Sequence, residues 1–245
     1  MRKSFLLKSS AFILGGMMFF ASCNKDDDNG GSNGGNSGNA FTIKATNVIN
    51  GSTQIATVKI YAEWFNGGDY SEDAIAQAPY KNNGFTLELP VTLADKYLTP
   101  IYEDELNDVA ISDKNVKWFF LEDIWAYDGN EKEMGYFFLE NQDGEKSYFT
   151  SWIYVDRNVT VKGEEKWIEY GEEYIDIYDW NLKKGWNVIY GSSTRSYNNS
   201  TGRYVDTFSS TSQKPSSVNY SWYFYNYDDI RAKKTKMIAK RNSLF

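Results

Sequence analysis

Apolar and polar residues alternate with a period of two from Phe41 onward. In residues 58–64, Val, Ile, Ala and Trp alternate with Lys, Tyr and Glu, and in residues 85–91 Phe, Leu, Leu and Val alternate with Thr, Glu and Pro. Because successive side chains of a strand point to opposite faces, this pattern is typical of half-buried β-strands. Between these two strands, the polar and glycine-containing residues 66–84 are predicted to form a loop.

The second half of the chain predicts further strands joined by short turns. They are expected at residues 117–127, 133–140, 147–156, 159–162, 174–180, 186–190, 204–210 and 220–227. Asp128-Gly129 and Asp143-Gly144 lie between consecutive strands, and Asp-Gly pairs favour chain reversals at positive φ. A meander of neighbouring strands is therefore the simplest arrangement.

Residues 92–112 are less regular. Thr99 and Pro100 precede three acidic residues at 103–105. This order is compatible with a short helix that Thr99 caps and whose first turn holds the acids, and it is equally compatible with a loop.

We predict a mostly β protein with an antiparallel β-sandwich-like fold, because few segments have helical periodicity. A division near residue 112 would give an N-terminal β unit at 40–112 and a C-terminal β unit at 113–227, as one domain or as two packed subdomains. A calycin-like closed β-barrel is the alternative, since a meander can also close and leave a ligand cavity.

The start of the chain has the pattern of a secretory signal peptide. Arg2, Lys3 and Lys8 precede an uncharged apolar run at residues 11–20. Such a run covers roughly 15 Å as a helix, about half of a hydrocarbon core of roughly 30 Å, so a permanent transmembrane helix is not expected. Residues 1–22 are therefore predicted to be removed.

Cys23, the only cysteine, follows the small residues Ala21 and Ser22. This arrangement resembles the lipobox of bacterial lipoproteins, although Phe20 stands where that family usually has Leu. The resemblance implies cleavage between Ser22 and Cys23 and acylation of Cys23. Two or three acyl chains exceed the single chain that binds membranes only reversibly, so the predicted anchor is durable.

The residues after Cys23 resemble the surface-export signal of Bacteroidetes lipoproteins, which is a lysine followed by acids: here Lys25, Asp26, Asp27 and Asp28. The resemblance implies an outer-membrane lipoprotein that faces outward. An EF-hand is not indicated, because the acids are consecutive and no Glu stands at loop position 12. Residues 29–39 contain only Gly, Asn and Ser, so residues 23–39 are predicted to form a lipidated flexible linker.

Three later segments resemble uncharacterised lipoproteins of gut Bacteroidetes. They are residues 154–163 (YVDRNVTVKG), residues 181–188 (NLKKGWNV) and Lys214-Pro215 before an aromatic strand. The resemblance covers most of residues 41–225 and implies no assigned activity. In addition, residues 84–90 (GFTLELP) resemble one strand of transthyretin-like sandwich modules of bacterial surfaces.

Composition excludes several chemistries. The chain has no histidine, so Ser-His-Asp and Cys-His nucleophile systems, His-ligated zinc and histidine pH switches each lack a necessary part. It has no second cysteine for an intrachain disulfide, and it has no glycine-rich nucleotide-binding motif. We therefore predict no cofactor and no metal site, the acidic turn at Asp228-Asp229 being too unspecific to indicate calcium.

Charge also limits the partners. Without residues 1–22 the chain keeps 23 basic and 33 acidic residues, a net charge of −10, so nucleic acid is not an expected partner. Residues 228–245 form a basic tail, in which Arg231, Lys233, Lys234, Lys236, Lys240 and Arg241 occur without an acid after Asp229. Such a tail either stays solvated or contacts an acidic polymer. The sequence predicts no oligomeric state.

Aromatic residues make up 17% of the chain and fall on both faces of the expected strands. Aromatic residues favour strands and fill β cores, but rings left in solvent would form an interaction patch. The candidates for stacking on a glycan are Trp152, Tyr154, Tyr174, Tyr178 and Trp180. The favoured function is non-catalytic binding of a polysaccharide or another host polymer.

Two other functions remain open. A carboxylate-dependent glycoside hydrolase would need two facing acids in a cleft, which sequence spacing alone does not reveal. A structural or adhesive surface protein would need no small ligand at all.

Overall fold

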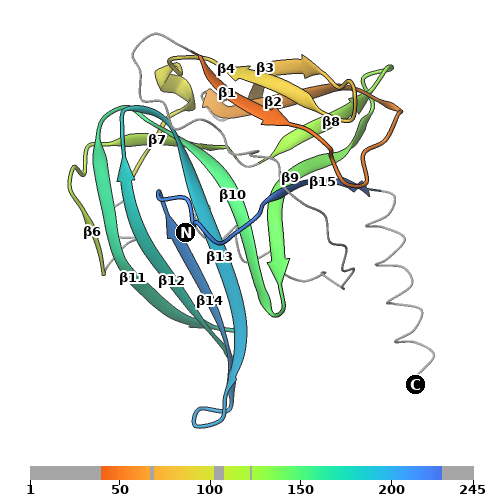
Figure 1. The fold of residues 1–245 in the computed structure, drawn as a ribbon. Helices are drawn as coiled ribbons and strands as arrows, with labels where there is room; N and C mark the ends of the chain where they lie inside the picture. Colours follow the sequence, from red (N-terminus) through yellow and green to blue (C-terminus); the bar gives the residue numbers. More distant parts are fainter. Residues whose placement is uncertain (1–39, 67–68, 102–107, 122, 228–245) are drawn as a thin grey trace.

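The computed structural model describes residues 40–66, 69–101, 108–121 and 123–227. Strands make up 68% of this part and are mostly antiparallel, and no α-helix is among its elements. A large sheet and a small sheet pack together, and the described strands form no closed barrel (Figure 1). The prediction of a sandwich-like β fold is confirmed, and the barrel alternative is wrong.

The small sheet consists of two antiparallel strands. These are β1 (Phe41–Ala45) and β4 (Phe85–Leu89), which pair from Phe41 with Leu89 to Ala45 with Phe85. In β4 the buried Phe85, Leu87 and Leu89 alternate with exposed residues, as the period of two predicted.

The large sheet has thirteen strands in the described residues. They are β2 (Ile55–Asn66), β3 (Asp69–Pro79), β5 (Thr99–Pro100), β6 (Val109–Ile111), β7 (Lys117–Leu121), β8 (Ile124–Asp128), β9 (Glu133–Asp143), β10 (Lys146–Val155), β11 (Val159–Glu169), β12 (Glu172–Leu182), β13 (Gly185–Asn198), β14 (Arg203–Thr211) and β15 (Ser221–Asn226). Its main path is β3-β2-β8-β9-β10-β13-β14-β12-β11-β6, while β15 pairs with β9, and β7 pairs with β10 and β5.

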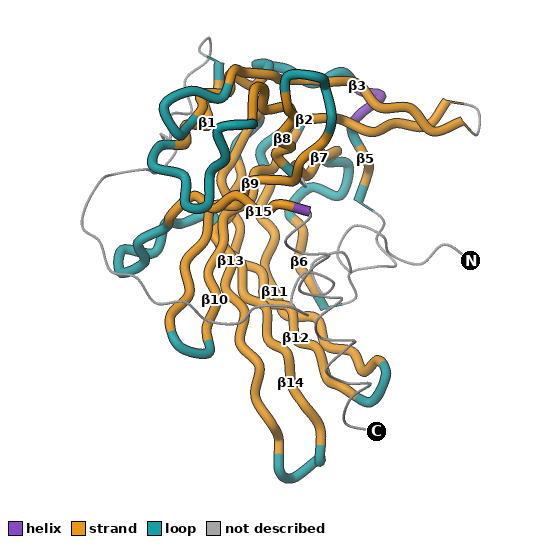
Figure 2. The backbone as a smooth tube through the Cα atoms, turned by 90° about the vertical axis from the view of Figure 1, so that its right-hand side faces the viewer, coloured by secondary structure: helices purple, strands orange, loops and turns teal. Residues whose placement is uncertain are grey.

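A continuous meander is therefore the wrong description. The consecutive strands β8, β9 and β10 are neighbours, but β10 next pairs with β13, and β12 runs parallel to β14. The β11–β12 hairpin thus lies outside β14 rather than beside β10. Figure 2 shows the long strands β10 to β14 side by side.

Residues 69–79, predicted to lie in a loop, form the strand β3. It pairs with β2 along its whole length, with a register shift between Ile60 and Tyr61. Only Ala76 and Ala78 of β3 are fully buried. The buried positions of this edge strand hold alanines, whose small side chains give a weaker alternation than large apolar ones, so the pattern missed it.

Two further predictions need correction. The single strand expected at residues 117–127 is two strands, because β7 ends at Leu121 and β8 starts at Ile124, and they pair with β10 and β9 respectively. Thr99 caps no helix, since it belongs to β5 and pairs with Trp118 of β7. A single 3-10 turn, η2 (Asp95–Tyr97), precedes it. The acids at 103–105 lie outside the described residues.

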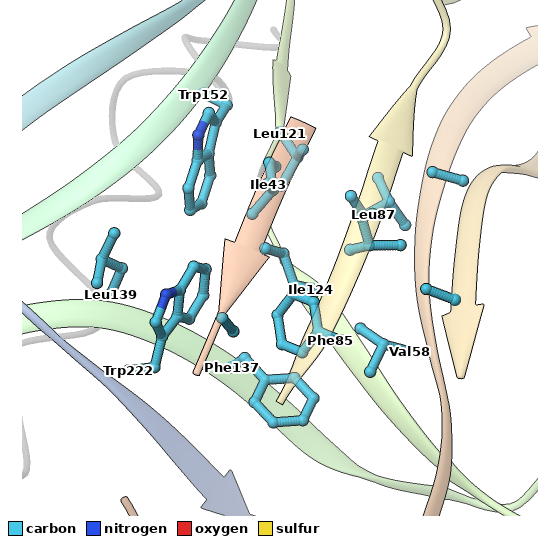
Figure 3. Packing of buried hydrophobic residues seen from close by; sticks show 14 of the residues in the cluster. Ile43, Val58, Phe85, Leu87, Leu121, Ile124, Phe137, Leu139, Trp152 and Trp222 are labelled. Atoms are coloured by element: carbon cyan, nitrogen blue, oxygen red, sulfur yellow. The ribbon is translucent and has the colours of Figure 1, made fainter. Parts of the chain in front are cut away.

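The β10–β13 pair separates two hydrophobic cores. Trp152 of β10 and Val188 of β13 belong to the first core, under the small sheet, while Ile153 and Ile189 belong to the second, with β7, β11 and β12. Because successive side chains face opposite sides, both faces of these two strands are buried in the stretch where Trp152 pairs with Val188. In the first core the rings of Trp152 and Trp222 stack, with centroids 5.8 Å apart. Figure 3 labels both side chains.

Pairing also crosses the expected boundary at residue 112. The strand β2, before this residue, pairs with β8, and β6 pairs with β11.

Candidate functional site

Four of the five aromatic residues predicted to stack on a glycan lie inside the cores. The exposed fractions of Trp152, Tyr154, Tyr178 and Trp180 are only 5%, 4%, 3% and 4%. Trp180 donates its indole N–H to Ser210 Oγ over 2.9 Å, and Tyr178 donates its hydroxyl to Asp176 over 3.1 Å. These rings present no face to solvent, so stacking on a sugar must fall to other aromatic residues.

Tyr174, the fifth candidate, is half-buried near the start of β12. Its ring lies nearly parallel to that of its cross-strand partner Trp167, with centroids 5.3 Å apart, and its hydroxyl donates to Glu172 over 3.2 Å. Its environment therefore differs from that of the four buried residues, because it is only half-buried.

The residues predicted for cleavage, acylation and export, Ser22, Cys23 and 25–28, lie outside the described part of the chain. No helix in the described part is long and apolar enough to cross a membrane.

The structure places six other aromatic residues together on β8, β9 and β15 and just after β15. In these strands one set of alternate residues, which includes Phe137, Leu139, Trp222 and Phe224, is buried in the first core. The other set lies on the opposite side of the sheet and is half-buried. We call it the aromatic face, and it consists of Trp125, Tyr136, Phe138, Tyr223, Tyr225 and, just after β15, Tyr227.

Strand register brings the rings of the aromatic face into one patch. Trp125 pairs with Tyr136, which pairs on its other side with Tyr225. The ring centroids of Trp125 and Tyr136 are 6.1 Å apart, and those of Tyr136 and Tyr225 are 5.6 Å apart and nearly parallel, at 21°. The ring centroid of Tyr227 lies 6.2 Å from the ring centroids of both Trp125 and Tyr136. Three strands therefore contribute to a continuous aromatic surface.

Gly135 lets β9 and β15 approach each other at this surface. It adopts φ +152°, and a Cβ atom there would lie 2.0 Å from the Tyr225 carbonyl oxygen. Only a glycine fits so close to the neighbouring backbone.

Three carboxylates border the aromatic face. Glu140 accepts a hydrogen bond from the Tyr225 hydroxyl, and burial raises its pKa. Burial, together with the negative charges of Glu133 and Glu63, raises the pKa of Asp123 to about 6. The pKa of Tyr227 is raised by burial and by a hydrogen bond to Glu133. The face thus combines rings, phenol hydroxyls and acceptor oxygens.

The chemistry of this face suits a polyhydroxylated ligand. Aromatic rings offer flat apolar surfaces, and carboxylates and phenols offer hydrogen-bond partners at their edges. In the described residues, no group of three or more Asp, Glu, Cys or His side chains is placed to hold a metal ion.

The sequence contains a signal for this face. Along residues 221–227, the even-numbered aromatic residues are Trp222 and Phe224, whereas the odd-numbered ones are all tyrosines: Tyr223, Tyr225 and Tyr227. Tyrosine hydroxyls need a partner or water, so the tyrosine set is the one expected to face outward.

No protein-family model matches this chain, and neither a curated protein nor a solved structure is significantly similar to it. The resemblance to lipoproteins of gut Bacteroidetes therefore stays a prediction from the sequence.

Proposed function

We propose that this protein is a lipid-anchored protein of the bacterial outer surface that binds a glycan or another host polymer, without catalysis, through its aromatic face. The observation that carries the proposal is the in-register row of Trp125, Tyr136 and Tyr225 on the side of the sheet away from the first core. The row is half-buried, and none of its three residues belongs to either core of the described part or packs against one. An aromatic patch outside the cores is typical of an interaction site.

The surroundings of the row support a sugar polymer in particular. Rings on three neighbouring strands give an extended chain more than one stacking position. Glu140 accepts a hydrogen bond from Tyr225, and the charge of Asp123 raises the pKa of Tyr136, so both carboxylates lie beside the rings. Carboxylate oxygens are acceptors that suit sugar hydroxyls. The linker and acylated Cys23 predicted from the sequence would present this face outside the cell.

Affinity electrophoresis of the chain from residue 23, with Cys23→Ser to prevent acylation, tests the proposal against a panel of plant, mucin and bacterial polysaccharides. We expect retardation by at least one polysaccharide and at least about tenfold weaker binding, roughly 1.4 kcal/mol, for Trp125→Ala and Tyr225→Ala. Tyr170→Ala is the control, because Tyr170 is 96% exposed on the β11–β12 turn. Equal binding by all variants would refute the aromatic face as the site. No retardation by any polysaccharide would favour a structural or adhesive role instead.

The raised pKa of Asp123 favours one second candidate, a carboxylate-dependent glycoside hydrolase. Asp123 would act as the general acid and Glu133, whose charge contributes to the raised pKa, as its partner. Release of reducing ends from the retained polysaccharide, abolished by Asp123→Asn, would establish this activity. Retention without any release would support binding alone.

A further inference from the structure

The strands β10, β13, β14 and β12 carry a groove on the sheet face opposite the aromatic face. Its volume is about 350 Å³, within the range of small-ligand sites, and Pro215 and Val218 of the β14–β15 connection form one wall. The four strands lie side by side in Figures 1 and 2.

Two cross-strand rows make the floor of the groove. The first row runs from Tyr148 through Ser192 and Ser209 to Ile177. The second, two residues along each strand, runs through Tyr190, Thr211 and Asp179. Direct partners in a sheet share one face, so these side chains converge on the same space.

The floor offers hydroxyl groups for which the described residues supply no partner. Ser192 and Ser209 are half-buried, and neither hydroxyl makes a hydrogen bond to another described residue. Tyr220 also has a buried hydroxyl without a partner in the described residues. Its ring centroid lies 5.8 Å from that of Tyr190, so this donor is beside the groove. Polar groups in such positions normally have a hydrogen-bond partner, whether protein, water or ligand.

Two charged side chains line the groove, Lys146 and Asp179. Lys146 lies over the ring of Tyr148, with its Nζ 5.0 Å from the ring centroid, and Asp179 pairs with Lys162 over 2.8 Å. Between them the floor offers hydroxyl groups and the Tyr148 ring, which suit a ligand with several hydroxyl groups and an apolar face.

We propose that this groove binds one sugar unit, with its apolar face against Tyr148 and its hydroxyls bonded to Ser192 and Ser209. This site is separate from the aromatic face, and the inference stands on the groove alone.

The test is amide chemical-shift mapping of the chain from residue 23, with Cys23→Ser. The probes are the methyl glycosides of glucose, galactose and mannose, then N-acetylglucosamine, with glucuronate as the charged counterpart. We expect at least one of these sugars to shift the amide signals of Ser192, Ser209 and Ser217 saturably. No shift with any of them would overturn the proposal.

Variants add a second, independent readout. Ser192→Leu fills the floor and should weaken binding at least about tenfold, whereas Ser196→Leu, on the same face of β13 but outside the groove and exposed, should not. Trp125→Ala should leave sugar binding at the groove unchanged, which separates this site from the proposed function. Unaltered binding by a folded Ser192→Leu protein would also overturn the assignment, and the mapping of the unsubstituted groove decides the matter if that variant does not fold.

Discussion

The hydroxyl of Tyr225 donates a hydrogen bond to Oε1 of Glu140, joining β15 to β9 on the aromatic face. Two opposing effects act on this carboxyl group. Burial raises the pKa of Glu140, and the hydrogen bond from Tyr225 lowers it. Burial also raises the pKa of Tyr225, and the negative charge of Glu140 adds to this, so the phenol remains a donor at neutral pH.

Tyr225→Phe should raise the pKa of Glu140 further, because it removes the donor that stabilises the ionised form. Near pH 7 we also expect a loss of about 1 kcal/mol in the free energy of unfolding. NMR titration of the Glu140 side-chain carbon measures the pKa, and urea denaturation measures the stability. Tyr223→Phe is the control, since it removes a neighbouring hydroxyl of the same face that does not bond to Glu140. An unchanged pKa of Glu140 in Tyr225→Phe would contradict the role of the hydrogen bond.

Asp176 should make stability fall as pH rises. Burial raises its pKa from the ordinary value of 3.8 to about 6, so the folded state binds the proton more tightly than the unfolded state. The resulting stabilisation is complete below the unfolded pKa and is lost as pH rises through about 6. Two pKa units correspond to about 3 kcal/mol as an order of magnitude.

We compare the free energy of unfolding of Asp176→Asn with that of the unsubstituted protein. The difference in favour of the variant should be larger at pH 7.5 than at pH 4, by about 3 kcal/mol. The amide oxygen of the variant can still accept the hydrogen bond from Tyr178. Urea denaturation across this pH range gives the difference curve, with Asp143→Asn, an exposed carboxylate at the end of β9, as the control. A flat difference curve for Asp176→Asn would show that burial does not shift this group.

Gly135→Ala should destabilise the fold by at least about 2 kcal/mol. The new Cβ atom would meet the Tyr225 carbonyl oxygen at 2.0 Å, and φ is +152° at this residue. Backbone atoms of β15 would have to move, which would also disturb the aromatic face. Gly129→Ala is the matched control, because a Cβ atom there has no neighbour within 4 Å. Thermal unfolding of the two variants compares them, and equal melting temperatures would contradict the close approach of β9 and β15.

The elements that the sequence predicted well are those whose own side chains alternate strongly. In β4 every second residue is a large apolar one that fills the first core, so the strand is evident from five residues. The edge strand β3 has alanines at its buried positions and escapes the same test. The parallel pairing of β12 with β14 was beyond the sequence pattern, because which strands become neighbours depends on contacts far apart in the chain.

The candidate site was predicted less well than the fold, for a related reason. Aromatic residues such as Trp152 and Trp180 have the composition expected of a glycan platform, but a second core covers the side of the sheet that would otherwise be open. Conversely, the row of Trp125, Tyr136 and Tyr225 exists only because register aligns three strands. Alternation reveals that a strand has two faces, and only the assembled sheets decide which face is covered.

Cys23→Ser should release the protein from the membrane fraction, because the thiol that carries the predicted acyl chains is lost. Fractionation of cells that express the variant, with immunodetection, measures this release. Ser22→Ala, which keeps a small residue before the cleavage position, is the control and should stay in the membrane. Retention of Cys23→Ser would refute the lipid anchor.

Replacing residues 25–28 with alanine should separate anchoring from display. Cys23 is intact in this variant, so it should still be acylated and membrane-bound, but without the Lys-Asp-Asp-Asp sequence it should face inward. Protease treatment of intact cells distinguishes the two orientations, since an outward protein is digested and an inward one is protected. Replacing residues 29–32 with alanine is the matched control, because it alters the linker and leaves the acids in place. Equal digestion of both variants would refute the export signal, and with it the route by which the aromatic face would reach a glycan outside the cell.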